Sequence, residues 1–128
     1  MIETKPYYEV RKITDLKDML ISSEKLYGDK TAFLVKKDGL PDYQPITYSK
    51  FKKDVEALGT AFLSLNLLNK RIAIIGENRY EWAVSYLATV NGTGTIVPID
   101  KELPLHEIEN LVKKGKCKHD NIFRYKKR

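Results

Sequence analysis

The sequence predicts an α/β fold: a partial doubly wound sheet with a parallel strand-helix-strand-helix unit, preceded by a helix, a β-hairpin and a long helix. Two observations carry this prediction. Residues 71–76 and 95–100 are short apolar runs, which are typical of strands buried on both faces. One helical pattern separates these runs and another follows, with short connections, as in a right-handed parallel crossover.

The first helix is expected directly after Thr14, which can cap it while Asp15 and Asp18 lie near its positive end. Gly28 is well placed to end this helix. Its apolar positions recur with helical spacing. They are Leu16, Met19, Leu20, Leu26 and Tyr27.

A hairpin is predicted next, because the β-branched and aromatic run 31–35 leads through the turn-forming stretch 36–41 into a second extended run, 43–47. Pro45 indicates an edge strand or an irregular one. Thr47 can cap the long helix, whose apolar stripe covers about two heptads and therefore favours packing on a sheet over a coiled coil. The stripe contains Phe51, Val55, Leu58, Phe62 and Leu65.

Two further helices flank the second buried strand. The first is expected to turn one side inward and to end at Asn91-Gly92. That side carries Trp82, Ala83, Tyr86, Leu87 and Val90. Pro104 opens the second helix, and no helical or strand period continues after Val112. The inward positions of this last helix are Leu105, Ile108, Leu111 and Val112.

The composition excludes a disordered protein, because 42% of the 128 residues are hydrophobic and 31% are charged. No apolar run approaches the roughly 20 residues that cross a bilayer, and the first residues lack the apolar stretch of a signal peptide. A cytoplasmic location is therefore expected. The single cysteine, Cys117, excludes an internal disulfide framework.

Positive charge is concentrated at the end of the sequence. Residues 113–128 hold eight Lys or Arg and one acid, which leaves 15 basic and 16 acidic residues in positions 1–112. We expect residues 113–128 to be a basic, divergent and disordered tail. With Phe123 and Tyr125 this tail could bind single-stranded nucleic acid through charge and stacking, although a solvated tail is favoured.

A dinucleotide site is one interpretation of the strand that leads through Gly76-Glu77-Asn78-Arg79 into a helix, with Asp100 ending the next strand. The fingerprint needs several glycines so that the backbone can approach a pyrophosphate at the helix N-terminus. Only Gly76 is present, and Glu77 places a carboxylate where phosphate would bind. We favour a structural strand-to-helix turn, with Asp100 as a cap or turn residue.

The segment Asn91-Gly92-Thr93-Gly94-Thr95 has the composition of a phosphate loop. Such a loop presents its amides at the start of a helix, with a lysine close behind. Here the segment follows a helix and precedes a strand, and no lysine occurs before Lys101. A helix end and turn is the favoured interpretation.

A metal site could involve Cys117 and His119, but a closed zinc site needs four ligands and His106 is the only other histidine. We favour an exposed, unstructured cysteine and histidine and expect no metal site. Two histidines without a nucleophile turn support no Ser-His-Asp or Cys-His arrangement, and the scattered carboxylates form no recognisable acid and base pair.

Several landmarks stand in a fixed order along the sequence. They are Gly28-Asp29-Lys30-Thr31-Ala32-Phe33, Ile46-Thr47-Tyr48, Gly76, Asn78, Glu81-Trp82, Gly92, Val97-Pro98-Ile99-Asp100 and Leu103-Pro104. In this order they resemble the N-terminal region of adenylate-forming enzymes, most closely the AMP-forming long-chain acyl-CoA synthetases, or fatty-acid CoA ligases. The resemblance covers about residues 7–112.

This resemblance implies an enzyme that joins a fatty acid to coenzyme A. The carboxylate attacks the α-phosphate of ATP with Mg²⁺, which gives acyl-adenylate and diphosphate, and the coenzyme A thiol then displaces AMP. The family supplies a Ser/Thr/Gly-rich loop ending in lysine, an adenine-binding aromatic-Thr-Glu segment, a ribose-binding Asp and a lid lysine. All of these lie downstream in the family, and none occurs in this sequence.

We therefore assign no catalytic, cofactor-binding or metal-binding residue to this chain, and we give Gly76, Asn78, Gly92 and Pro98 backbone and packing roles. Residues 1–112 are expected to be an incomplete N-terminal part of an AMP-binding domain. Where the family continues into another parallel strand, this chain reads Gly115-Lys116-Cys117-Lys118-His119-Asp120. A truncated or frameshifted product, inactive alone, is the expectation.

Two other functions remain open. The chain could be an interaction module that docks on a separately encoded remainder of the ligase and covers an exposed sheet edge, or a small nucleic-acid binder that uses its basic tail. Without later strands, we expect apolar surface near Ile96, Val97 and Ile99 to face water.

Overall fold

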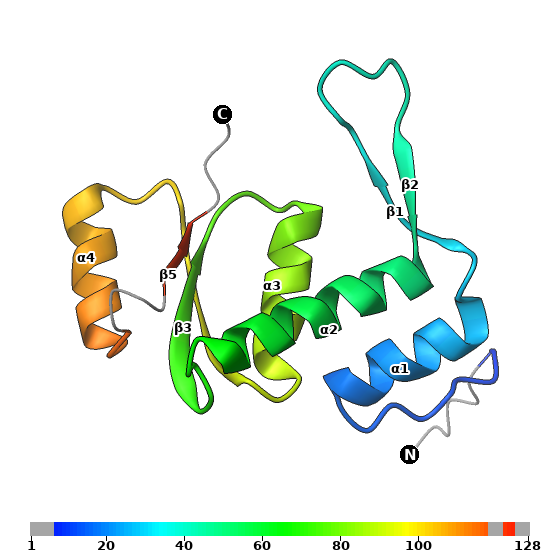
Figure 1. Ribbon diagram of the computed structural model, residues 1–128, viewed down its shortest axis with the longest axis horizontal. Helices are drawn as coiled ribbons and strands as arrows, with labels where there is room; N and C mark the ends of the chain where they lie inside the picture. Colours follow the sequence, from blue (N-terminus) through cyan, green and yellow to red (C-terminus); the bar gives the residue numbers. More distant parts are fainter. Residues whose placement is uncertain (1–6, 118–121, 125–128) are drawn as a thin grey trace.

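The computed structural model describes residues 7–117 and 122–124 of the 128-residue chain. A helix, a hairpin and a long helix precede alternating strands and helices (Figure 1). Their bounds are α1 Leu16–Tyr27, β1 Thr31–Val35, β2 Gln44–Thr47, α2 Tyr48–Ser64, β3 Lys70–Ile75, α3 Tyr80–Val90, β4 Gly94–Ile99, α4 Leu105–Lys114 and β5 Ile122–Arg124. Within these described ranges, no helix has the length and apolar character needed to cross a membrane.

Helix α1 is capped by Asp15, so the expected Thr14 cap was wrong by one position. The Asp15 carboxylate accepts the backbone N–H of Asp18 at 2.7 Å, a bond strengthened by its charge. Thr14 instead donates its own N–H and hydroxyl to the Asp18 carboxylate, at 3.0 and 3.2 Å. Gly28 ends the helix as predicted. A Cβ there would lie 2.9 Å from Ser49 Oγ, so close packing favours glycine.

The predicted hairpin is present: β1 and β2 pair antiparallel, with Pro45 opposite Leu34. Only these two strands form this sheet in the described chain, so Pro45 lies on an edge strand, as expected. Helix α2 follows β2 without a loop. Its N-cap is Thr47, as predicted, because the Thr47 hydroxyl accepts the N–H of Lys50 at 3.2 Å.

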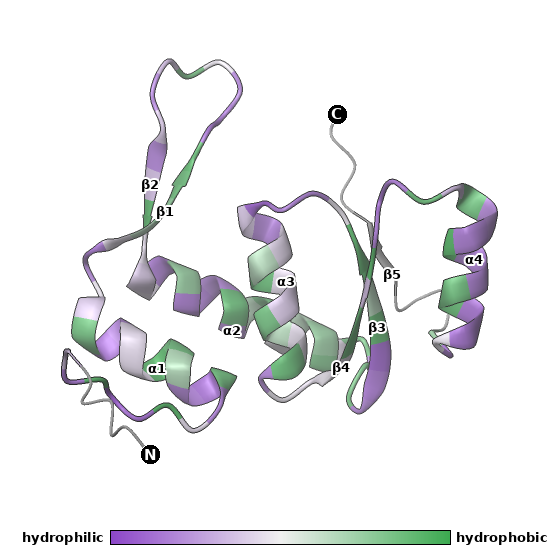
Figure 2. Cartoon of the chain, turned by 180° about the vertical axis from the view of Figure 1, so that it is seen from behind, coloured by the Kyte–Doolittle hydropathy of each residue, from purple (hydrophilic) through white to green (hydrophobic). Residues whose placement is uncertain are grey.

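The second sheet contains three parallel strands in the order β4-β3-β5. Helices α2 and α3 pack on one face of β3 and α4 packs on the other, so the sheet is doubly wound (Figures 1 and 2). In the parallel register Ile72 lies opposite Ile96, and Ile75 lies opposite Ile99. The predicted fold class, including the strand-helix-strand-helix unit, is therefore confirmed.

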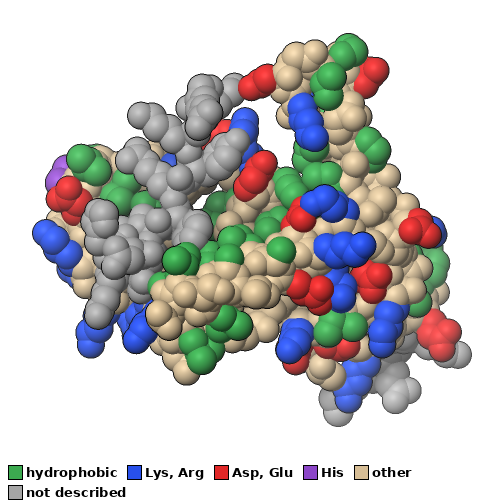
Figure 3. Space-filling model, in the orientation of Figure 1, with side chains coloured by type: hydrophobic (Ala, Val, Ile, Leu, Met, Phe, Trp, Pro, Cys, Tyr) green, Lys and Arg blue, Asp and Glu red, His purple; other side chains and the backbone are tan. Residues whose placement is uncertain are grey.

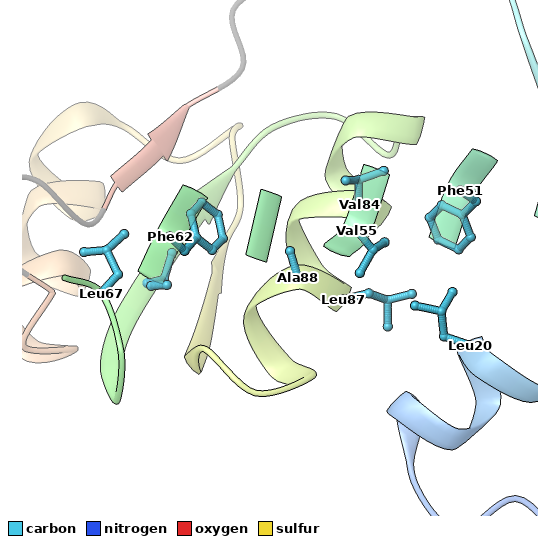
Figure 4. Close-up of a cluster of buried hydrophobic side chains, with 9 residues drawn as sticks. Leu20, Phe51, Val55, Phe62, Leu67, Val84, Leu87 and Ala88 are labelled. Atoms are coloured by element: carbon cyan, nitrogen blue, oxygen red, sulfur yellow. The ribbon is translucent and has the colours of Figure 1, made fainter. Parts of the chain in front are cut away.

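Two apolar cores lie on the two faces of the sheet, and alternate residues of β3 enter each of them. Ile72 joins the larger core (Figure 4), which also contains Leu20, Phe51, Val55, Phe62, Leu67, Val84, Leu87 and Ala88. Ala73 and Ile75 join the smaller core, which also contains Ile99, Ile108 and Cys117. Burial of an aliphatic side chain contributes roughly 1.5–3 kcal/mol, so β3 stabilises both layers.

Helix α3 buries a side that overlaps the predicted one. Leu87 is buried as predicted, and the predicted residues Ala83, Tyr86 and Val90 pack half-buried against the same core. Val84 and Ala88, which were not predicted to face inward, are buried as well. Trp82 is half-buried and stacks on Tyr86, with ring centroids 5.2 Å apart. Helical spacing alone does not choose between these neighbouring faces.

Helix α4 also differs from its prediction. Leu105 and Leu111 are 63% and 41% exposed, and only Ile108 is buried. Val112, which was also predicted to face inward, is half-buried against the same core. Ile99 is nevertheless buried in the same core as Ile108 of this helix. The expectation that Ile99 faces water was therefore wrong.

Strand β5 was not predicted, because three residues are too few to show an alternating pattern. It pairs parallel with β3, and Ala73 lies opposite Ile122. The parallel strand that we expected to be missing after the last helix is therefore present. The predicted domain boundary after residue 112 stays a prediction, and the remaining tail residues, 118–121 and 125–128, lie outside the described residues.

A hydrogen bond ties the start of α3 to α2. The Tyr80 hydroxyl donates to Asp54 Oδ2 at 2.7 Å, and Lys50 pairs with the other carboxylate oxygen. Burial and the hydrogen bond to Asp54 raise the pKa of Tyr80 well above its usual range. Burial opposes ionisation of Asp54, but hydrogen bonds from Lys50 and Tyr80 outweigh it and lower the pKa of this carboxyl. The pair fixes the position of the α3 N-terminus.

Gly94 and Gly59 offer a matched test of the packing between β3 and β4. A Cβ at Gly94 would lie 2.3 Å from the Lys70 carbonyl oxygen, whereas a Cβ at Gly59 would meet no atom closer than 3.7 Å. We expect Gly94→Ala to lower the free energy of unfolding by about 1–3 kcal/mol and Gly59→Ala to raise it by about 1 kcal/mol. Urea unfolding followed by circular dichroism measures both, and equal effects would contradict the register.

Removing the Tyr80 hydroxyl tests the bond between α2 and α3. We expect Tyr80→Phe to lower the free energy of unfolding at pH 7 by about 1–2 kcal/mol, and Tyr86→Phe, on the same helix, to change it little. Because folding raises the pKa of Tyr80, its contribution is complete below the ordinary value of 10.0 and is lost at higher pH. A deficit of Tyr80→Phe that stayed constant through pH 11 would argue against this assignment.

Candidate functional site

The carboxyl ends of β3 and β4 form the first candidate site, because ligands of open α/β sheets bind at this edge. A hollow of about 320 Å³ lies there. The turn after β3 supplies one wall and the end of β4 supplies the other. Its lining is Gly76, Glu77, Asn78, Trp82, Pro98, Ile99, Asp100 and Lys101. The structure thus brings together the sequence landmarks Gly76, Asn78, Pro98 and Asp100.

Charges at this edge are paired within the chain. Glu77 accepts hydrogen bonds from Lys101 Nζ at 3.3 Å and from Arg79 Nε at 3.1 Å. The bond from Lys101 is the main cause of the lowered pKa of Glu77. Lys101 also pairs with Glu102 at 2.8 Å, and its pKa is raised by both carboxylates, Glu102 first. A carboxylate therefore occupies the position between the cations that a phosphate would need.

The remaining groups at this edge serve the turns. Asp100 Oδ1 accepts the N–H of Glu102 at 2.9 Å, which is the turn role we expected for Asp100. Helix α3 begins without a side-chain cap and has Glu81 in its first turn. An acidic side chain near a helix N-terminus interacts with the positive end of the helix dipole and so competes with an anionic ligand for that position. Because Glu77 and Glu81 lie near the start of α3, this helix N-terminus does not fit a pyrophosphate.

A larger groove, of about 690 Å³, adjoins this hollow and shares Asn78 and Trp82 with it. It separates β1 from the first turn of α3, and Figure 3 shows the molecule hollowed beside the hairpin. Phe33 and Tyr80 stack edge to face in its wall, with ring centroids 5.2 Å apart. The sequence analysis missed the contribution of β1, because nothing in a local pattern indicates which helix a hairpin will face.

The segment once compared with a phosphate loop lies at the opposite edge of the sheet. Asn91 is the C-cap of α3, and Gly92 has a φ of 135°, which favours glycine. The Thr93 hydroxyl donates to the Ala88 carbonyl at 2.9 Å, in the interior. This geometry is that of a helix end and turn, and it presents no amide cradle at a helix start.

No metal centre is formed by the part of the chain that the structure describes, where no three His, Cys, Asp or Glu side chains gather. Cys117 is buried, which corrects the expectation of an exposed cysteine, and burial raises the pKa of its thiol. It enters the core beneath α4 because the chain turns back after Gly115. His106 lies on the exposed side of α4, and His119 and Tyr125 lie outside the described residues.

Comparison with solved structures shows which proteins share this fold. The crystal structure of IdnL1 superposes with a TM-score of 0.73 at 18% identity, over 83% of this chain and 22% of that one. The N-terminal subdomain of NpsA from Klebsiella oxytoca gives a TM-score of 0.65 at 20% identity, over 79% of this chain and 25% of that one. CmiS6 gives 0.71 at 16%, over 88% and 29%.

Sequence comparison adds a curated relative and a family. The human medium-chain acyl-CoA ligase ACSF2, a mitochondrial protein, is 28% identical over 74 residues. That match covers 57% of this chain and 12% of the ligase, so the chain spans a small part of its relative. The model of the family described as AMP-binding enzyme matches residues 22–119. This match covers most of the chain, including α2, the crossover from β3 to β4 and the hollow at their carboxyl ends, so the chain belongs to the AMP-binding enzyme family.

Proposed function

We propose that this chain is the N-terminal piece of an AMP-forming acyl-CoA ligase, which converts a fatty acid, ATP and coenzyme A to acyl-CoA, AMP and diphosphate. The family match, which extends over residues 22–119, carries this proposal. The human relative is a medium-chain acyl-CoA ligase, and the sequence landmarks resemble long-chain ligases. Both point to a fatty acid as the carboxylic acid.

The proposal includes inactivity of this chain by itself. Adenylate formation needs donors and cations around a phosphorus centre, where negative charge accumulates. Arg79 and Lys101 lie near the carboxyl ends of β3 and β4, and both contact Glu77. These residues do not fit the triphosphate of ATP or its Mg²⁺. The ATP-binding groups and the coenzyme A site would therefore come from a remainder of the ligase outside this sequence.

What this chain would contribute is a scaffold. Its parallel strands end beside the hollow at Gly76 and Asp100, and the bond between Tyr80 and Asp54 holds the helix that borders it. In a complete ligase, further parts of the protein would face these carboxyl ends and meet a wall in which Glu77, Arg79 and Lys101 are paired. A cytoplasmic location remains part of the proposal, and cell fractionation tests it.

We expect the purified full chain to show no fatty-acid-dependent exchange of labelled diphosphate into ATP, because Arg79 and Lys101 already pair with Glu77. Octanoate and palmitate serve as the medium-chain and long-chain acids. Exchange above the level without acid would show that the chain is active alone. A complementation experiment tests whether the chain supplies the missing part of a ligase. The human ligase is prepared without the segment that this chain matches, and the wild-type chain is added to it. Exchange should then return, whereas the Gly94→Ala variant, in which β3 and β4 cannot pack closely, should not restore it.

An interaction module is the second candidate, supported by the order β4-β3-β5, which leaves the outer edges of β4 and β5 unpaired in the described chain. Unpaired edges recruit other strands. We expect sedimentation equilibrium to show association of the chain with itself or with the separately prepared remainder. A monomer at every concentration that also ignores the remainder would remove this candidate.

A further inference from the structure

The amino ends of the parallel strands form a second edge, which lies opposite the candidate site. The end of α2, the start of β3 and the end of α4 meet there (Figure 1). Arg71 Nη1 donates to the Gly115 carbonyl at 3.3 Å and so ties the start of β3 to the end of α4. This meeting follows from the fold, because each crossover helix runs back from the carboxyl end of one strand to the amino end of the next.

The described segments that meet at this edge are rich in cations and contain no acid. Residues 57–76 and 110–117 include neither Asp nor Glu. Five exposed basic residues lie in them, namely Lys70, Arg71, Lys113, Lys114 and Lys116. The four lysines form no ion pair with a described residue, whereas Lys50, Lys52 and Lys101 all pair with carboxylates. Figure 2 shows the hydrophilic start of β3 next to its hydrophobic body.

Three exposed leucines lie in the segment that leads from the end of α2 to Lys70 at the start of β3. Leu63, Leu65 and Leu68 are 47%, 62% and 51% exposed, while their neighbours Phe62 and Leu67 are buried. Figure 3 shows hydrophobic side chains near Lys and Arg side chains along the lower edge of the molecule. We call these three leucines and five basic residues the amino-edge patch. Its lysines at the end of α4 also suit the helix dipole, but a dipole explains neither Lys70 nor the exposed leucines.

We propose that the amino-edge patch binds an anionic lipid surface. The leucines would enter the boundary between headgroups and acyl chains, and the basic residues would contact the anionic headgroups. Charge complementarity selects an anionic partner, and the exposed leucines select a lipid surface over a nucleic acid, because a nucleic acid would leave them in water. The proposal does not rest on the proposed ligase function, since it concerns the opposite edge of the sheet.

The experiment measures co-sedimentation of the full chain with vesicles of phosphatidylcholine and phosphatidylserine in a 3:1 ratio, an anionic fraction of about a quarter that gives the surface charge the proposal needs. Binding should be strong at low salt, weaker at high salt and absent on vesicles of phosphatidylcholine alone. Lys113→Gln with Lys114→Gln should weaken it about 30-fold. Leu65→Ser with Leu68→Ser should weaken it about tenfold. All four side chains are exposed, and thermal unfolding verifies that the variants stay folded.

Two charge-matched controls locate the effect. Lys12→Gln with Lys37→Gln removes two exposed lysines from other parts of the surface and should leave vesicle binding nearly unchanged. Lys126→Gln with Lys127→Gln removes the same charge from the basic tail and should have a smaller effect than the α4 pair.

Three results would overturn the proposal. One is vesicle binding that neither patch variant weakens. Another is a loss caused only by the tail pair, which would assign binding to the tail. The third is loss with the lysine pair but unchanged binding with the leucine pair, together with tight binding of a single-stranded oligonucleotide, which would identify a nucleic acid as the partner.

Discussion

Burial of β3 on both faces is the constraint on which the rest of this structure depends. The strand sends Ile72 into the core beneath α2 and α3, and Ala73 and Ile75 into the core beneath α4. Its apolar residues are stable only if both layers and both neighbouring strands are present. β4 and β5 pair with this strand, and α2, α3 and α4 cover its two faces. The pairing of β3 with β4 begins where Gly94 lies close to the backbone of Lys70.

The parallel arrangement gives the two edges of the sheet different chemistry. At the carboxyl edge, turns and helix starts bring Glu77, Arg79 and Lys101 together, and their charges are satisfied within the chain. At the amino edge, helix ends and strand starts bring together lysines that pair with no carboxylate of the described chain, together with exposed leucines. The charges described at the first edge are paired with one another, while the second edge exposes lysines and leucines to the solvent.

Helix α3 connects the hairpin half of the chain with the parallel sheet. Its buried residues pack on α2 and β3, and Tyr80 binds Asp54 at the end that borders both hollows. Trp82 lines both hollows, while Tyr86, on which it stacks, packs half-buried against the core. A residue identified from the sequence as apolar packing thus became part of the surface on which any ligand or further domain would lie.

The sequence by itself determined the order and type of the elements from α1 to α4, because runs such as 71–76 and caps such as Thr47 act through local contacts. It also identified the family through landmarks from Gly28 to Pro104. Only the tertiary structure decided that Val84 and Ala88 of α3 are buried and that Trp82 lines the hollows, since helical spacing alone does not choose between neighbouring faces of a helix. It likewise decided that Cys117 enters the core and that residues 122–124 pair with β3. Those outcomes depend on contacts between distant segments, which a local pattern does not contain.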